Sequence, residues 1–121
     1  MQNLGYNIRM EDQNLESLIL FHKALSDGTR LRIINLLMEG ACCVTEIAMA
    51  LGVSQSRISQ HLNVLRHAGM VKVARKGVSR CYSLNTERFP PELFDCVKRA
   101  REGSPLLLGD IKNLRGQRNI Y

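Results

Sequence analysis

Apolar residues recur at helical spacing along most of the chain before Gly69, which predicts a series of amphipathic helices. The first predicted helix begins at Asn14, and a second follows Asp27, whose side chain is expected to cap it. A short third helix contains Ile47, and a fourth begins after Ser54, a further expected N-cap. Glycines mark the ends of the last three helices: Gly40, Gly52 and Gly69. The pattern therefore predicts a mainly α-helical fold over this part of the chain.

After Gly69 the spacing of apolar residues changes from helical to alternating, which is typical of β-strands. Residues 70–75 and 79–84 both alternate, and Lys76 with Gly77 supplies a turn between them. The sequence therefore predicts a β-hairpin with a basic tip.

One more helix is predicted after the hairpin. It begins at Phe89 and the two prolines that follow, and it ends around Gly103. For residues 106–121 a short helix and an irregular tail are both open. A chain of 121 residues fits one domain that buries its own core. The expected organisation is a flexible arm over 1–13, a globular domain over 14–102 and a C-terminal extension over 103–121.

The sequence contains no apolar run of the length that spans a bilayer, so we expect no membrane partner. Residues 1–13 lack the apolar core and the small-residue cleavage site of a signal peptide. The expected location is therefore the cytoplasm, where the four cysteines stay reduced rather than forming a disulfide framework.

The net charge of +6 is concentrated in the middle of the chain. Residues 53–86 contain six basic residues and no acidic one. These are Arg57, Arg66, Lys72, Arg75, Lys76 and Arg80. A localised basic block beside more neutral flanks is the electrostatic pattern of a protein that binds a polyanion.

The third and fourth predicted helices, joined by a turn at Gly52, form a helix-turn-helix. Its apolar residues are expected to pack the two helices against each other, so that the polar start of the fourth helix faces outward. The candidate DNA contacts there are Ser54, Gln55, Ser56, Arg57, Ser59 and Gln60. These side chains suit base edges and phosphates in a major groove. In the hairpin, Arg75, Lys76 and Arg80 are expected to lie along the neighbouring backbone or minor groove. The predicted fold class is mainly α with a β-hairpin wing, a winged helix-turn-helix of five or six helices.

Three runs of the sequence resemble ArsR/SmtB-type regulators: residues 21–34 (FHKALSDGTRLRII), 54–62 (SQSRISQHL) and 65–71 (LRHAGMV). The resemblance covers about residues 14–100, and it departs at Gly28, where the family usually has proline. That glycine is expected to loosen the start of the second helix slightly. The resemblance implies a homodimer built from the first and last helices and bound to a palindromic operator in double-stranded DNA. It also carries Gln55, Ser56, Ser59 and Gln60 over as recognition residues, with Ser54 as the cap.

Members of this family usually release DNA when a metal, metalloid or oxidant binds. The zinc-type site on the last helix needs Asp/His pairs, and residues 90–102 contain no histidine, so we expect no such site. The arsenic-type site resembles Cys-Val-Cys at the start of the third helix. Here Cys43 matches the first cysteine and Thr45 replaces the second, while Cys42 is an additional neighbour. The resulting hypothesis is an As(III) or Sb(III) site at Cys42 and Cys43, and the helix N-terminus is expected to favour a thiolate there.

Several alternatives stay open. A third ligand is expected from Cys81, Cys96 or a partner subunit, although packing roles are favoured for Cys81 and Cys96. Cys42 and Cys43 are also candidates for packing, or for a redox or persulfide switch with Cys96. A constitutive DNA binder without an effector and a protein-interaction module are the remaining functions. His61 is interpreted either as a structural histidine or as a DNA contact.

Catalysis is disfavoured, because the sequence has no Gly-rich phosphate loop, no nucleophile motif and no acid/base pair in a plausible cleft. No cofactor is expected to be required for DNA binding.

Overall fold

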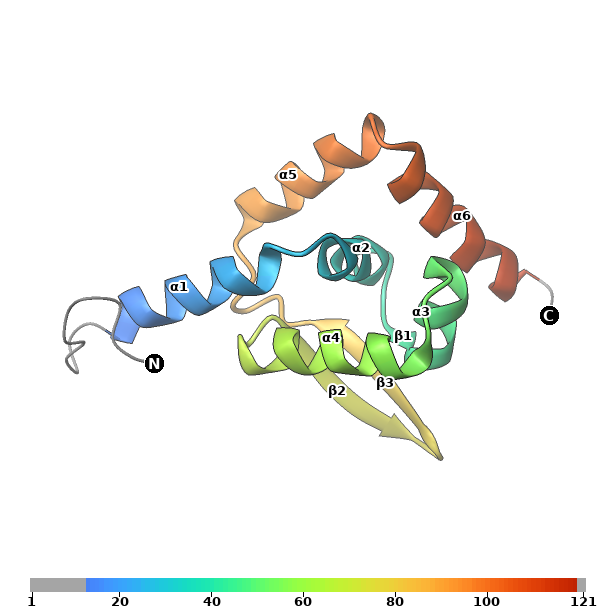
Figure 1. The fold of residues 1–121 in the computed structure, drawn as a ribbon, viewed down its shortest axis with the longest axis horizontal. Coiled ribbons are helices and arrows are strands. Elements are labelled where there is room, and N and C mark those ends of the chain that lie inside the picture. Colours follow the sequence, from blue (N-terminus) through green and yellow to red (C-terminus); the bar gives the residue numbers. More distant parts are fainter. Residues whose placement is uncertain (1–12, 120–121) are drawn as a thin grey trace.

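The computed structural model describes residues 13–119, which form six helices and three strands (Figure 1). In chain order these are α1 (Gln13–Leu25), α2 (Gly28–Leu37), β1 (Cys42–Cys43), α3 (Val44–Leu51), α4 (Gln55–His67), β2 (Val71–Lys76), β3 (Ser79–Leu84), α5 (Pro91–Glu102) and α6 (Pro105–Arg118). The predicted winged helix-turn-helix is confirmed. Of the predicted arm, residues 1–12 lie outside the described residues, and Gln13 already opens α1.

Helix α2 is the centre of the core. Ile33, Ile34 and Leu36 are fully buried, and α2 lies between α5 and α6 on one side and α4 with the sheet on the other (Figure 1). Its start is fixed by Asp27, whose carboxylate accepts a hydrogen bond from the backbone N–H of Arg30 at 3.0 Å. Gly28 is the first residue of α2, so the departure from proline leaves the cap in place.

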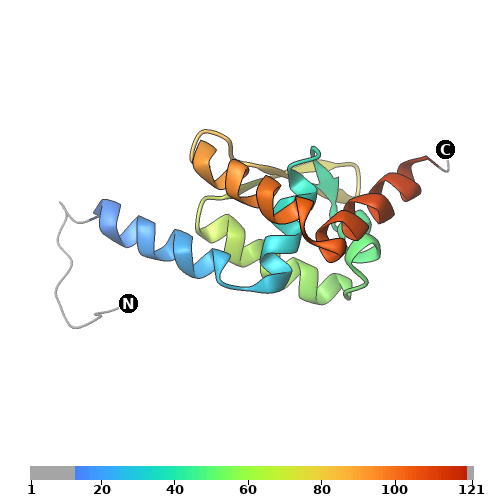
Figure 2. The same ribbon diagram turned by 90° about the horizontal axis from the view of Figure 1, so that it is seen from above.

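Helix α1 extends away from the rest of the molecule (Figures 1 and 2). Only its last turns contribute to the core, through the buried Ala24 and the partly buried Phe21 and Leu25. Leu18 is 54% exposed in the single chain, and Leu15 and Leu20 are exposed as well. No helix within residues 13–119 combines the length and the apolarity needed to cross a bilayer.

The hairpin is part of a three-stranded antiparallel sheet, which the alternation pattern did not predict. The strand order is β1-β3-β2, and β1 contributes two residues, with Cys42 opposite Tyr82 and Cys43 opposite Cys81. Two residues are too few for an alternating pattern to show in a sequence. The short strand joins the start of α3 directly to the wing.

The C-terminal segment is a helix rather than an irregular tail. The last helix of the described chain is therefore α6 and not the helix that begins at Pro91. Helix α6 packs on α2, α3 and α5, with Ile111 and Leu114 buried in the common core. Its pattern is weak because Asp110, which is 2% exposed, stands where an apolar residue is expected.

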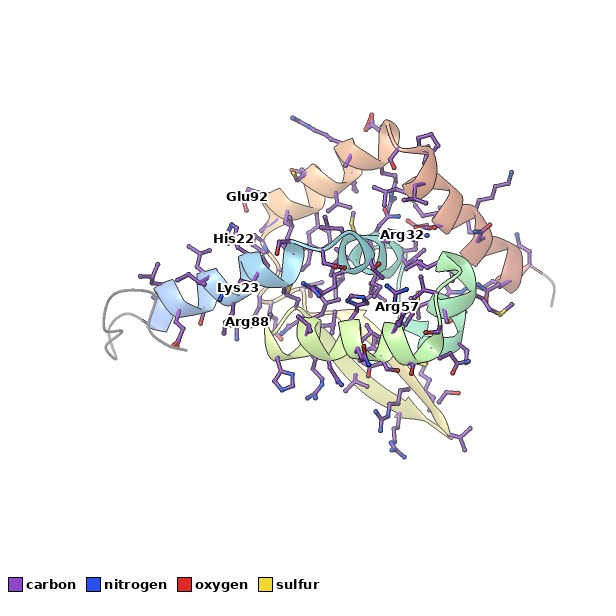
Figure 3. All side chains as sticks on the ribbon, viewed as in Figure 1. His22, Lys23, Arg32, Arg57, Arg88 and Glu92 are labelled. Carbon is purple, nitrogen blue, oxygen red and sulfur yellow. The ribbon has the colours of Figure 1, made fainter. Side chains whose placement is uncertain are left out.

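A buried ion pair explains how Asp110 is accommodated. The Arg32 guanidinium extends from α2 toward α6 (Figure 3) and donates to both carboxylate oxygens of Asp110, at 2.8 and 2.9 Å. It also donates to the backbone carbonyl of Leu51 at the end of α3. Because a buried carboxylate is costly unless it is paired, this bidentate contact allows α6 to dock on α2 and α3.

Replacing Asp110 with asparagine is expected to lower the free energy of unfolding by about 3 kcal/mol, because Arg32 then loses its charged partner. Urea unfolding at matched protein concentration measures the change. Glu87→Gln is the control, since Glu87 is 81% exposed beside Lys72 and such a surface pair contributes at most about 1 kcal/mol. An Asp110→Asn variant as stable as the control would contradict this role of the ion pair.

Candidate nucleic-acid interface

The helix-turn-helix is formed by α3 and α4. Gly52 ends α3 in the left-handed conformation, with φ of 68°, which a residue with a Cβ atom rarely adopts. Ser54 begins α4, and its hydroxyl accepts a hydrogen bond from the backbone N–H of Arg57 at 3.3 Å. The inner face of α4 consists of Ile58, Leu62 and Leu65, which are fully buried.

That inner face determines which side chains of α4 point to solvent. The residues predicted to contact DNA from this helix, Ser54, Gln55, Ser56, Arg57, Ser59 and Gln60, are all exposed. In Figure 3 the labelled Arg57 lies on the side of α4 away from the hairpin. The outer surface of the first turns of α4 is therefore rich in hydrogen-bonding groups and free of acidic residues.

The wing is the hairpin of β2 and β3. Lys76 pairs with Ser79, so the loop consists of Gly77 and Val78, and Gly77 has φ of 63°. Glycine at the first position of a two-residue loop is favoured in tight hairpins. The side chains of Arg75, Lys76 and Arg80 near this loop are exposed.

A groove connects the two predicted DNA-contacting elements. Its volume is about 410 Å³, and its walls come from the start of α3, the first turns of α4 and the tip of the wing. Gln55 and Ser59 of α4, Arg80 of the wing and Cys43 all line it. The structure therefore brings candidate DNA contacts and a thiol to one groove.

The basic block is largely free of neutralising partners. All six of its basic side chains are exposed, and Lys72 forms an ion pair with Glu87 at 3.2 Å. Within residues 13–119, the other five have no carboxylate within 4.0 Å. Their charge is available to a polyanion, and counterion release then makes binding sensitive to salt.

His61 has a structural environment. Its side chain is 17% exposed, and Nδ1 lies 3.3 Å from the Arg30 guanidinium and 3.8 Å from the Asp27 carboxylate. These contacts join α4 to the start of α2. Of the two interpretations of His61, the structural one agrees with this packing.

The vicinal cysteines do not face the same way. Successive side chains of a strand point to opposite faces, so Cys42 and Cys43 separate. Cys42 is 1% exposed in the core, where the Arg118 guanidinium lies 3.6 Å from its sulfur and burial raises the pKa of its thiol to about 11. Cys43 is partly exposed on the groove. In the single chain the two thiols therefore lie in different environments, and the joint Cys42/Cys43 metal site stays a prediction.

Cys43 instead has Cys81 as its neighbour. The two are register partners in β1 and β3, and a hydrogen bond with Cys81, with burial as the second cause, raises the pKa of Cys43 to about 11. The pKa of Cys43 is thus raised and not lowered, against the effect expected of the helix N-terminus, because the neighbouring thiol, burial and Glu46 outweigh the lowering by Lys76. The pairing of Cys81 with Cys43 was not predicted, because β1 is too short to be recognised from the sequence.

Cys96 is exposed on α5 in the single chain, and its expected packing role on a dimer helix stays a prediction. Helix α5 packs on α2 and α6, whereas Cys42 and Cys43 lie in the sheet. By sheet register the cysteine opposite Cys43 is Cys81, and the redox switch with Cys96 stays a prediction. Within the described chain, no group of three or more His, Cys, Asp and Glu side chains has a geometry that holds a metal ion.

Comparison with known proteins identifies the relatives of this chain. A family model described as "Bacterial regulatory protein, arsR family" matches residues 27–73. The transcriptional repressor SdpR of Bacillus subtilis is 44% identical over 64 residues, which are 53% of this chain and 71% of SdpR. The arsenic resistance transcriptional regulator ArsR1 of Pseudomonas putida is 46% identical over 66 residues, 54% of this chain and 52% of ArsR1.

A solved structure extends the likeness to most of the fold. The homodimeric winged helix-turn-helix DNA-binding domain Mb0332 of Mycobacterium bovis is 30% identical, with a TM-score of 0.68. The match covers 83% of this chain and 91% of that domain.

Replacing Cys81 with alanine is expected to lower the pKa of Cys43 and to speed its alkylation by iodoacetamide. At pH 8, thiolate and hence rate rise about tenfold for each unit by which the pKa falls. Mass spectrometry of quenched time points measures the rate at Cys43, and the exposed Cys96 in the same protein is the internal control. An unchanged pH–rate profile of Cys43 alkylation would show that Cys81 does not raise the pKa of Cys43.

Proposed function

The chain belongs to the ArsR family of bacterial regulatory proteins, and from this premise we propose that it is a homodimeric repressor that leaves its operator when a thiophilic species binds. As a member of that family it is a DNA-binding transcriptional regulator and not an enzyme. The observation that carries the proposal is the groove in which Gln55 and Ser59 of α4, Arg80 of the wing and Cys43 come together.

Sequence-specific recognition is assigned to the first turns of α4. Gln55, Ser56, Ser59 and Gln60 are exposed there, and their amides and hydroxyls match donors and acceptors on base edges. Ser54 holds the helix start through its cap. Arg75, Lys76 and Arg80 supply positive charge for the adjacent phosphates or minor groove, and Arg57 is assigned to the backbone on the other flank of α4.

The dimer is proposed to form through α1 and α5. Leu15 and Leu18, one turn apart on α1, are exposed although α1 packs mainly on α2, and α5 exposes most of its surface. An apolar face of this kind is typical of a surface covered by another chain. The similar domain Mb0332 is homodimeric. Two copies would place two α4 helices on successive major grooves of a palindromic operator.

The effector is proposed to act through cysteine. The similar regulator ArsR1 is named for arsenic resistance, and thiolates suit soft, thiophilic species such as As(III) and Sb(III). In this chain the accessible thiol on the DNA-facing groove is that of Cys43. A species bound there lies between the recognition helix and the wing, which links its binding to release of DNA.

Two substitutions separate base reading from phosphate binding. An operator is first selected from random DNA, and a homodimer predicts inverted half-sites about one helical turn apart. Gln55→Ala is expected to lose about 1–3 kcal/mol on that operator and little on random DNA. Arg75→Ala is expected to weaken both alike and to reduce the salt dependence by about one ion. Fluorescence anisotropy at several salt concentrations measures all four affinities.

Equal losses on both DNAs for Gln55→Ala would contradict the placement of the reading surface. Leu108→Ala, on an exposed position of α6, is the matched control and should leave both affinities unchanged.

The effector hypothesis is tested by titrating the operator complex with arsenite, antimonite, phenylarsine oxide, Zn²⁺, Cd²⁺, hydrogen peroxide and a persulfide donor. The proposal expects a thiophilic arsenic or antimony compound to release the DNA. A variant with Cys42→Ala and serine at the other three cysteines should bind DNA and not release it. Release of the wild type by oxidants alone would favour the redox alternative. Retention of DNA under every condition would identify a constitutive binder.

A further inference from the structure

We propose that Cys43 and Cys81 form a cross-strand dithiol site for a monosubstituted trivalent arsenical, a compound in which arsenic carries one carbon group. The inference deepens the proposed function, on which it rests, by naming the two ligands and the class of effector. It replaces the predicted Cys42/Cys43 pair with residues 38 positions apart in the sequence.

The sheet register brings the two thiols together. Cys43 and Cys81 occupy directly opposite positions of antiparallel strands, where Cβ atoms are about 4.5–5.5 Å apart. Opposite residues share a face of the sheet, and Cys81 is the largest cause that raises the pKa of the Cys43 thiol. Two sulfur atoms on neighbouring strands can therefore bind the same atom without rearrangement of the backbone.

The site is reached from the groove. Cys43 lies on the wall of the 410 Å³ cavity, and Cys81, opposite it in the sheet, is 8% exposed. An incoming compound meets Cys43 first and then closes a second bond to Cys81. Cys42, with 1% exposure in the core, is not open to this approach.

The number of ligands selects the class of compound. Structural zinc sites usually need four protein ligands, and within residues 13–119 no third Cys, His, Asp or Glu completes a metal site around this pair. Trivalent arsenic forms three bonds, so an arsenic atom that already carries one carbon needs two sulfur atoms. The dithiol satisfies that requirement within a single chain.

The binding step is a condensation without a redox change. In the hydrated form, R–As(OH)₂, each thiol replaces one hydroxyl group, so two As–O bonds break and two As–S bonds form. Each departing hydroxide takes the proton of one thiol and leaves as water. Arsenic stays trivalent, both sulfurs stay at the thiol oxidation level, and no oxidant or reductant is consumed.

The carbon substituent provides the link to DNA. With arsenic held by the two sulfurs, the substituent occupies the cavity between α4 and the wing. Gln55, Ser59 and Arg80 line that space, and all three are assigned to DNA contact. A bulky group there competes with the operator for the same side chains.

The test uses the full chain and phenylarsine oxide as the probe. Intact mass is expected to show one adduct per chain, thiol titration to fall from four free thiols to two, and peptide mapping to place the adduct on Cys43 and Cys81. Cys43→Ser and Cys81→Ser should each weaken phenylarsine oxide binding at least about a hundredfold, because the arsenic is then held by one As–S bond instead of two. Arsenite, which lacks the carbon group, should bind the wild type more weakly than phenylarsine oxide does.

Cys96→Ser, on α5 and outside the sheet that holds Cys43 and Cys81, is the matched control and should bind the probe as the wild type does. Operator affinity and thermal unfolding of each variant in the absence of arsenical verify its fold, and Cys81→Ala serves where Cys81→Ser unfolds. An adduct on Cys42 or Cys96, or undiminished binding without Cys81, would overturn the site. If the site is overturned but phenylarsine oxide still releases the wild-type protein from its operator, the proposed function stands. A Cys43/Cys81 adduct that stays on DNA would establish the site and contradict effector release.

Discussion

The antiparallel pairing of β1 with β3 is the constraint on which the DNA-facing surface depends. Two residues of β1 fix where α3 begins, and α3 with the turn at Gly52 fixes where α4 begins. The same pairing sets the position of β3 and hence of the wing. A short backbone ladder thus holds the recognition helix and the basic hairpin in register, and a change between Cys43 and Cys81 acts on both elements at once.

Helix α6 stabilises that ladder from the other side. Arg118 donates to the Glu46 carboxylate at 2.9 Å and to the carbonyl of Ala41, next to β1. Glu46 in turn accepts a hydrogen bond from the backbone N–H of Cys43. The hydrogen bond from Arg118 is the largest cause that lowers the pKa of Glu46. The C-terminal helix is therefore part of the support of the interface, and the boundary at 103–121 does not separate it from the core.

Sequence patterns predicted what depends on periodicity and local capping, and they missed what depends on contacts between distant residues. Ser54 with the apolar spacing of Ile58 and Leu62 determines α4, and the predicted nine DNA-contacting residues are all exposed. Strand β1 is too short to show an alternating pattern, so the Cys43–Cys81 pair could not be predicted from the sequence. Helix α6 was ambiguous because Asp110 breaks its apolar face, and only the contact with Arg32 explains why that residue is buried.

The coupling between the thiol pair and the DNA-facing surface is tested most directly by amide hydrogen exchange of the free protein with and without phenylarsine oxide. If the thiol pair is coupled to the DNA-facing surface, amide exchange changes at β1, β3 and the first turn of α4, while α5 keeps its exchange rates. Changes confined to α1 and α5, with the sheet and α4 unaffected, would contradict it.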